Sequence, residues 1–193
     1  IRTYGLGEKE IRGKRFADSK KDLKNNGDLY SLTQAATICD IHRRFLEAGA
    51  DIIETNTFSG TSIAQAEFFR EGKKNPEFFQ GIIEDTFLND LAWEINFESA
   101  KQCRKWADIV GEQTGRRRYV AGAIGPMTVS LSQFPDLTDL SFRYVTFDQV
   151  KAAYKHQVRA LIAGGVDTLL VETIFDSLNA KTALVAIREV FEE

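Results

Sequence analysis

The sequence predicts an α/β fold in which short parallel strands alternate with helices. Three apolar, strand-like segments, 51–57, 119–124 and 166–173, are separated by stretches whose apolar residues have helical spacing. This alternation is typical of parallel strands joined by crossover helices. It fits either a doubly wound sheet or a (β/α)8 barrel. Three strands are too few to close a barrel, which typically needs about 250 residues.

The first part of the chain predicts a loop, a helix and a strand. Residues 1–30 are rich in Lys, Asp, Gly and Asn, which predicts a long loop with one short helix. Residues 33–48 have helical spacing, and Gly49 stands where a C-terminal helix cap is expected. The apolar face of this helix is predicted to carry Ile38, Ile41, Phe45 and Ala48. The β-branched segment 51–57 is typical of a buried parallel strand.

Two helical stretches and a second strand are predicted in the middle of the chain. The helical pattern occupies 61–69 and 89–110. Pro76 lies between them, and it cannot sit inside a continuous helix without cost. The second strand, 119–124, ends at Gly125 and the proline that follows it.

The last third predicts a loop, two helices and a third strand. A long loop at 127–146 precedes a helix at 147–163, and the strand 166–173 leads to a final helix capped by Asp176 or Ser177. The inward faces are predicted to carry Val150, Tyr154, Val158 and Leu161 in the first helix and Ala180, Leu184, Ile187 and Phe191 in the second.

Two glutamates mark the predicted ligand end of the sheet. Segments 48–55 and 164–173 resemble one another, each running from a glycine through Asp and apolar residues to Glu-Thr. Their Asp-to-Glu spacings differ by two residues, so Glu54 and Glu172 are predicted to face the same side. Sites in parallel α/β folds lie at the carboxyl ends of strands. A carboxylate there can bind an ammonium group, act as a base or hold a metal; alternatively, it caps amides or pairs with Lys or Arg.

Smaller polar residues and glycines accompany the two glutamates. Asn56, Thr57 and Thr173 can orient a small polar ligand, or they can cap the helices that follow. Gly122 and Gly125 allow a ligand or another backbone segment to approach closely, or they simply form a tight turn.

Composition excludes several classes of function. The net charge of −3 gives no support for nucleic-acid binding, and no apolar stretch approaches the ~20 residues of a membrane span. No signal peptide is evident, and Cys39 and Cys103 suit a reducing compartment, so a cytoplasmic protein is expected. Cys39 and His42 have a metal-like spacing, but no second pair follows them. Because Met127 is the only methionine and Ile1 comes first, we expect a processed or partial chain.

Seven strings of the sequence carry a family resemblance: 12–18, 22–29, 48–58, 61–66, 119–126, 146–148 and 171–181. Together they resemble the homocysteine S-methyltransferase domain, the N-terminal module of cobalamin-dependent methionine synthases. The strings 12–18 and 22–29 resemble methionine synthases more than betaine-dependent relatives. The resemblance spans nearly the whole chain.

The resemblance implies a (β/α)8 barrel, of which residues 1–193 would form a partial domain with about the second to fourth strands. The N-terminal strand and the C-terminal half would lie outside this sequence. Family members bind zinc through three cysteines on later strands, and Cys39 and Cys103 match none of them. Zinc favours the homocysteine thiolate, which attacks methylcobalamin and gives methionine. The implied partners are homocysteine and the cobalamin and folate modules of a parent protein.

The resemblance also implies roles for particular residues. Glu172 matches the family glutamate that contacts the amino-acid part of homocysteine. Glu54, Asn56 and Thr57 match the second-strand motif and are expected to line the pocket, and Gly125 matches the next strand-end loop.

Two regions depart from the family pattern, and two alternative functions stay open. The loop 127–136 is altered, and 69–88 is interpreted as an insertion. We expect the isolated chain to be inactive, because it lacks the family's metal ligands. The first alternative is a non-catalytic domain derived from the same barrel that binds a partner through its open sheet edges. The second is a small α/β enzyme that uses Glu54 and Glu172 directly.

Overall fold

The computed structural model describes residues 1–193, with every side chain except that of Arg2. Helices and short strands alternate along the chain, as the sequence predicts. In chain order the elements are the 3-10 helix η1 (Arg2–Tyr4), α1 (Glu8–Arg12), the 3-10 helix η2 (Gly27–Leu29), α2 (Tyr30–Thr33), α3 (Ala35–Glu47), β1 (Ile52–Glu54), α4 (Ser62–Phe69), α5 (Pro76–Glu84), α6 (Thr86–Thr114), β2 (Tyr119–Ile124), α7 (Phe147–Ala163), β3 (Thr168–Val171) and α8 (Ser177–Phe191).

The three strands form one parallel sheet in the order β1-β2-β3, which confirms the predicted parallel α/β arrangement. Glu54 of β1 is in register with Ala121 of β2, and Ala121 is in register with Thr168 of β3. The ladder continues one residue beyond two of the strands. The N–H of Thr55 donates to the Ala121 carbonyl, and that of Glu172 donates to the Ile124 carbonyl.

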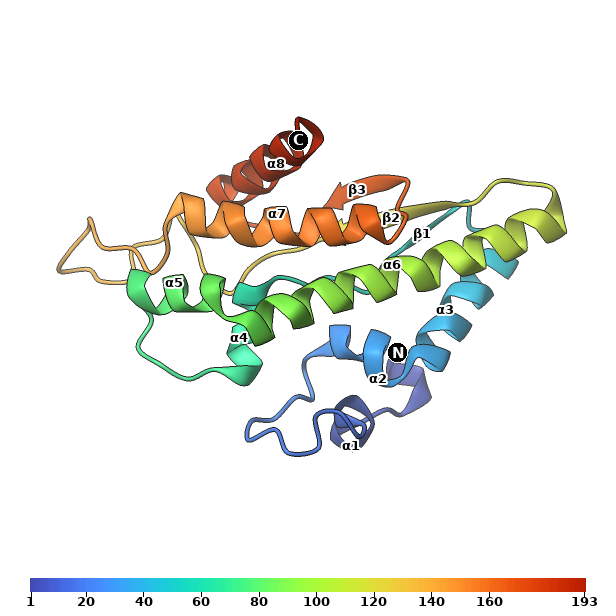
Figure 1. Ribbon diagram of the computed structural model, residues 1–193, viewed down its shortest axis with the longest axis horizontal. Coiled ribbons are helices and arrows are strands. Elements are labelled where there is room, and N and C mark those ends of the chain that lie inside the picture. Colours follow the sequence, from blue (N-terminus) through green and yellow to red (C-terminus); the bar gives the residue numbers. More distant parts are fainter.

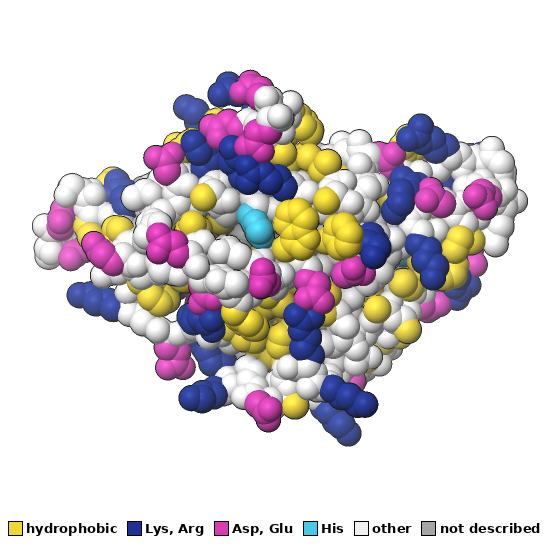
Figure 2. Space-filling model, in the orientation of Figure 1, with side chains coloured by type: hydrophobic (Ala, Val, Ile, Leu, Met, Phe, Trp, Pro, Cys, Tyr) yellow, Lys and Arg dark blue, Asp and Glu magenta, His cyan; other side chains and the backbone are white. Residues whose placement is uncertain are grey.

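Helices pack against one face of the sheet. Ile53 and Val120 point toward α3 and α6, where they contact Leu46 and Cys103 in a common apolar cluster. Helices α6 and α7 run side by side over the sheet, and α8 lies beyond α7 (Figure 1). On the side of the molecule drawn in Figure 2, basic and acidic side chains are interspersed and neither sign predominates.

The other face of the sheet lies open. Strand alternation and register place Ile52, Glu54, Tyr119 and Leu170 on it. Ile52 is 58% exposed and Leu170 is 40% exposed, although both are large apolar residues. In a (β/α)8 barrel this face of each strand points into the barrel. The exposed apolar side chains on this face therefore fit a partial barrel.

The apolar face predicted for α7 is confirmed. Val150, Tyr154, Val158 and Leu161 are all fully buried in the largest core cluster, which also includes Ile124 of β2. Thr146 caps the helix, because its hydroxyl accepts the N–H of Gln149 and the Gln149 side chain returns to the N–H of Thr146.

The faces predicted for α3 and α8 are wrong in part. In α3 the buried residues are Ile38, His42 and Leu46, whereas Phe45 is 64% exposed. In α8, Leu184 and Phe191 are 58% and 68% exposed. The residues that α8 buries are Asn179, Thr182, Ala183 and Ala186. In both helices the buried face includes polar residues, and their side chains have hydrogen-bond partners inside the protein.

Three expectations about the bounds of elements need correction. The helical pattern is interrupted after Phe69, as predicted, but Pro76 starts a helix that was not predicted, α5, in which the side chain of Asn75 accepts the N–H of Phe78. The long helix α6 begins at Thr86 and ends at Thr114, so it extends past both predicted ends. The first 30 residues contain α1 and the two 3-10 helices η1 and η2, which is more helix than predicted.

No helix in the described chain combines the length and the apolar character needed to cross a membrane.

Candidate functional site

Two carboxyl groups meet at the carboxyl end of the sheet. Glu54 is the last residue of β1, and Glu172 directly follows β3. The pKa of Glu54 is raised to about 7, first by partial burial and then by a hydrogen bond with the nearby Glu172 carboxyl and repulsion from it. Strand parity therefore predicted correctly that the two side chains share one side of the sheet. We call Glu54 and Glu172 the carboxylate pair.

Thr173 holds one member of the carboxylate pair in place. Its hydroxyl donates to Oε2 of Glu172 at 3.0 Å. Its backbone has φ 53°, in the left-handed region, and it is the only described non-glycine residue with positive φ. A β-branched residue rarely adopts this conformation. Backbone outliers of this kind gather at functional sites, where the surrounding structure enforces them.

The side chain of Asn56 links this end of the sheet to the N-terminal part of the chain. Its Nδ2 donates to the Gly27 carbonyl at 2.9 Å and to Oγ of Ser31 at 3.0 Å. The N–H of Asn56 donates to Oγ of Ser99 in α6 at 2.8 Å. The amide is thus used within the protein, and it lies next to the carboxylate pair as part of its support.

Thr57 is fully buried between β1 and β2. Its Oγ1 donates to the Ala123 carbonyl at 2.8 Å and lies 2.7 Å from Oγ1 of Thr55. Oγ1 of Thr55 in turn accepts the N–H of Ala123 at 2.9 Å. The two threonines therefore continue the pairing of β1 with β2 beyond Glu54 by means of their side chains.

Another backbone segment, and not a ligand, lies close to Gly125. A Cβ added at this position would lie 2.2 Å from the carbonyl oxygen of Phe58, so the two strand-end loops pack too closely for any other residue. The carbonyl of Gly125 accepts the hydroxyl of Tyr154 at 3.1 Å. This glycine therefore sets how closely the ends of β1 and β2 approach each other.

An apolar groove adjoins Glu54. It has a volume of about 380 Å³ and lies between α3 and the free edge of β1, where it reaches Glu54 and Asn56. Its walls include Ile41, Phe45 and Ile52. A groove of this size with a carboxylate at one end is suited to a small ligand that has both a charged and an apolar part.

Asp28, which sequence reasoning missed, has a fully buried carboxylate at the same end of the sheet. It accepts the N–H of Ser59 at 2.6 Å and the N–H of Phe58. Burial raises the pKa of Asp28 to about 7, although the two N–H groups act in the opposite direction. The motif around Asn26 predicts only a turn, since no periodic pattern marks a buried aspartate in a polar segment.

Asp176 joins the altered 127–136 loop to α8. It caps the N–H of Leu178 at 2.8 Å, as predicted, and also accepts the N–H of Ser132 at 2.9 Å and the hydroxyl of Ser130. Burial acts to raise the pKa of Asp176, but these hydrogen bonds outweigh it and hold the pKa well below its usual range. The loop is thereby held beside the end of β3.

The described side chains do not provide a zinc site. Among them, no group of three His, Cys, Asp or Glu residues is placed to hold a metal ion. Cys103 is buried with its Sγ 3.2 Å from Nε2 of His42. Burial raises the pKa of the Cys103 thiol and lowers the pKa of His42 to about 4, so the pair is neutral at pH 7. Cys39 is half-buried on α3.

Residues 7–192 match the protein family described as homocysteine S-methyltransferase. The chain belongs to the homocysteine S-methyltransferase family.

Solved structures of the homocysteine methyltransferase MmuM from Escherichia coli share its fold. The oxidized form superposes with a TM-score of 0.58 at 16% identity, over 84% of this chain and 49% of that one. The metallated form gives 0.57 at 18% identity, over 96% and 56% of the two chains. The apo form gives 0.57 at 16% identity, over 85% and 49%. This chain thus spans about half the length of these structures, with the fold of a partial (β/α)8 barrel.

Proposed function

We propose that residues 1–193 form the homocysteine-binding part of a homocysteine S-methyltransferase. The observation that carries this proposal is the carboxylate pair at the carboxyl end of a parallel sheet, in a chain of this family. Homocysteine carries an ammonium group, and two adjacent carboxyl groups are suited to bind a cation.

The carboxylate pair is suited to bind a cation. Without a ligand, the two carboxyl groups repel each other, and the raised pKa of Glu54 records this repulsion together with its burial. An ammonium group between them would favour the ionised form of Glu54. Glu172 would make the main contact, and Thr173 would orient it through the 3.0 Å hydrogen bond. The groove beside Glu54 would receive the apolar part of the amino acid.

Asn56, Thr57 and Gly125 would shape the pocket. Their hydrogen bonds and close contacts hold the ends of β1 and β2 together. We propose that they set the spacing of the pocket walls, with direct ligand contact left to the carboxylate pair.

The finer assignment is to the barrel of a cobalamin-dependent methionine synthase, and the strings at 12–18 and 22–29 support it. Methylcobalamin would supply the methyl group, and cobalamin and folate modules of a parent protein in the cytoplasm would be the partners. Because the described side chains do not fit zinc, its ligands would have to come from outside residues 1–193. The chain alone would then bind homocysteine without methylating it.

Calorimetric titration with L-homocysteine tests the proposal. The wild-type chain is expected to bind, and Glu172→Gln is expected to weaken binding about tenfold or more, equivalent to about 1.4 kcal/mol. Glu112→Gln, an exposed carboxylate on α6, serves as the matched control and should bind like wild type. Equal affinity in all three proteins, or none in the wild type, would contradict the proposal. Turnover of homocysteine and methylcobalamin by the chain alone would contradict its expected inactivity.

A further inference from the structure

We propose that Asp28 is a positioning residue that fixes the turn formed by residues 56–60, and through it the carboxylate pair. We call residues 56–60 the β1 turn. The inference rests on the proposed function, because it assigns Asp28 a part in shaping the same site from outside the sheet.

The geometry of Asp28 is that of a clamp on backbone amides. Asp28 is 4% exposed, and its carboxylate accepts the N–H groups of Phe58 and Ser59, the latter at 2.6 Å. Both amides belong to the β1 turn, and neither is in a helix or a strand. A carboxylate can accept two N–H groups because it has acceptors only, whereas an asparagine would also present an NH₂ group to them.

The segment that carries Asp28 is itself held against the β1 turn. Asn26 and Gln65 form a reciprocal pair of buried amide hydrogen bonds at 2.7 and 3.2 Å. Nε2 of Gln65 also donates to the Ser59 carbonyl at 3.0 Å. Asn56 reaches back to the Gly27 carbonyl at 2.9 Å. Asp28 therefore meets the turn in a preset position, which is the condition for a positioning role.

A short path connects the β1 turn to the carboxylate pair. The turn begins two residues after Glu54, and the carbonyl oxygen of Phe58 in this turn packs on Gly125 at the end of β2. Thr57 in the turn donates to the Ala123 carbonyl at 2.8 Å. Movement of the turn would loosen these contacts and with them the place of Glu54. Glu172, on the far side of β2, would then lose a fixed partner.

Stability alone does not account for this aspartate. A buried carboxylate without a charged partner opposes folding when it is ionised, and the pKa of Asp28 raised to about 7 reflects this cost. A group that is unfavourable for folding at neutral pH and yet holds a strand-end turn is expected where binding geometry matters.

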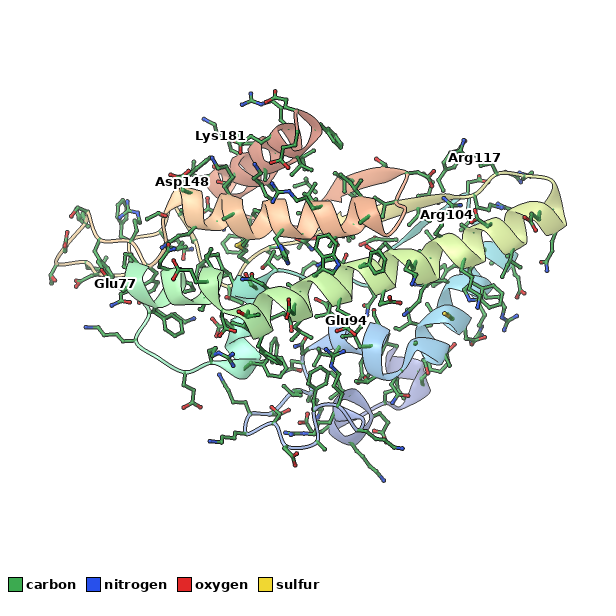
Figure 3. The ribbon with its side chains drawn as sticks, in the orientation of Figure 1. Glu77, Glu94, Arg104, Arg117, Asp148 and Lys181 are labelled. Atoms are coloured by element: carbon green, nitrogen blue, oxygen red, sulfur yellow. The ribbon has the colours of Figure 1, made fainter. Side chains whose placement is uncertain are left out.

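The test compares Asp28→Asn with Asp167→Asn in the whole 193-residue chain. Asp167 is the matched control because it also accepts a strand-end amide, the N–H of Val120 at 2.8 Å. It lies at the amino end of the sheet with Arg104 and Arg117, whose side chains are labelled in Figure 3. Amide hydrogen exchange should become about tenfold faster or more at Phe58 and Ser59 in Asp28→Asn only, and at Val120 in Asp167→Asn only. Unchanged exchange at Phe58 and Ser59 would show that Asp28 does not hold these two backbone amides in place.

Affinity and stability are measured on the same two variants. Asp28→Asn should raise the Kd for L-homocysteine about tenfold without lowering the thermal midpoint at pH 8, whereas Asp167→Asn should leave the Kd unchanged. Faster exchange with an unchanged Kd would overturn the positioning role. Failure of Asp28→Asn to fold, repeated with Asp28→Ser, would also overturn it, because Asp28 would then be needed for folding itself. Absence of binding in the wild type would refute the proposed function, and exchange alone would then decide whether Asp28 fixes the turn.

Discussion

Replacing Asp28 with asparagine should change how stability depends on pH. The pKa of this carboxyl is raised from 3.8 to about 7 by burial. Between these values the folded chain keeps a proton that the unfolded chain releases, so folding takes up a proton. The contribution of Asp28 to stability is therefore greatest below about pH 4 and is lost as pH rises toward 7. Asparagine does not titrate, so it removes this loss.

The size of this change in the free energy of unfolding follows from how far the pKa of Asp28 is raised. Each pKa unit corresponds to about 1.4 kcal/mol, so the free energy of unfolding of Asp28→Asn, minus that of wild type, should rise by about 2 kcal/mol from pH 5.5 to pH 7. His42, whose pKa is lowered to about 4, titrates in both proteins, and its effect cancels in the difference. Glu54, whose pKa is also raised to about 7, is replaced by glutamine in both proteins, so that any movement of its side chain adds nothing to the difference.

Urea unfolding at several pH values, followed by circular dichroism, gives the difference directly. The two proteins should have equal m-values, so that midpoints can be compared. A difference that stays constant from pH 5.5 to pH 8 would contradict the raised pKa of Asp28, because it would show that Asp28 titrates as an ordinary exposed carboxyl. A difference that falls with pH would show that its pKa is lowered in the fold.

Three further experiments test Gly125, Asp176 and Cys103. Gly125→Ala should destabilise the chain by about 1–3 kcal/mol in urea unfolding, because its Cβ would stand 2.2 Å from the Phe58 carbonyl; a stability equal to wild type would show that the loops separate freely. Asp176→Ala should cost about 1–2 kcal/mol in thermal unfolding, since it loses the α8 cap and the bond to the N–H of Ser132; a loss under about 0.3 kcal/mol would contradict this. Cys103 should react with a thiol reagent only after unfolding, because burial keeps it protonated; rapid modification in the native chain would show that it is accessible.

Much of the fold could be predicted from the sequence, because the period of apolar residues and the turn residues both reflect local physics. The α7 face follows from Val150, Tyr154, Val158 and Leu161, which have no competing stripe. Periodicity could not decide α3, where burial of His42 depends on its contact with Cys103 of α6, 61 residues away. A contact so distant in sequence leaves no mark on local spacing.

The candidate site also has features that the sequence predicts and features that it does not. Strand parity correctly placed Glu54 and Glu172 on one side, because parallel strands alternate their side chains with a fixed period. Residue type alone could not show that Thr57 and the side chain of Asn56 are used within the protein. Nor could it identify Asp28, since its partners are backbone amides, which every residue but proline carries.

We propose that the carboxylate pair receives the ammonium group of homocysteine. The most direct test of this proposal is to follow the side-chain carboxyl carbon of Glu54 by NMR against pH, with and without L-homocysteine. We expect a pKa of about 7 for Glu54 in the free chain, and a clear fall in that pKa when homocysteine is bound, because the ammonium group favours the carboxylate. An ordinary pKa of Glu54 in the free chain, or an unchanged pKa at saturating homocysteine, would show that the carboxylate pair does not receive the ammonium group.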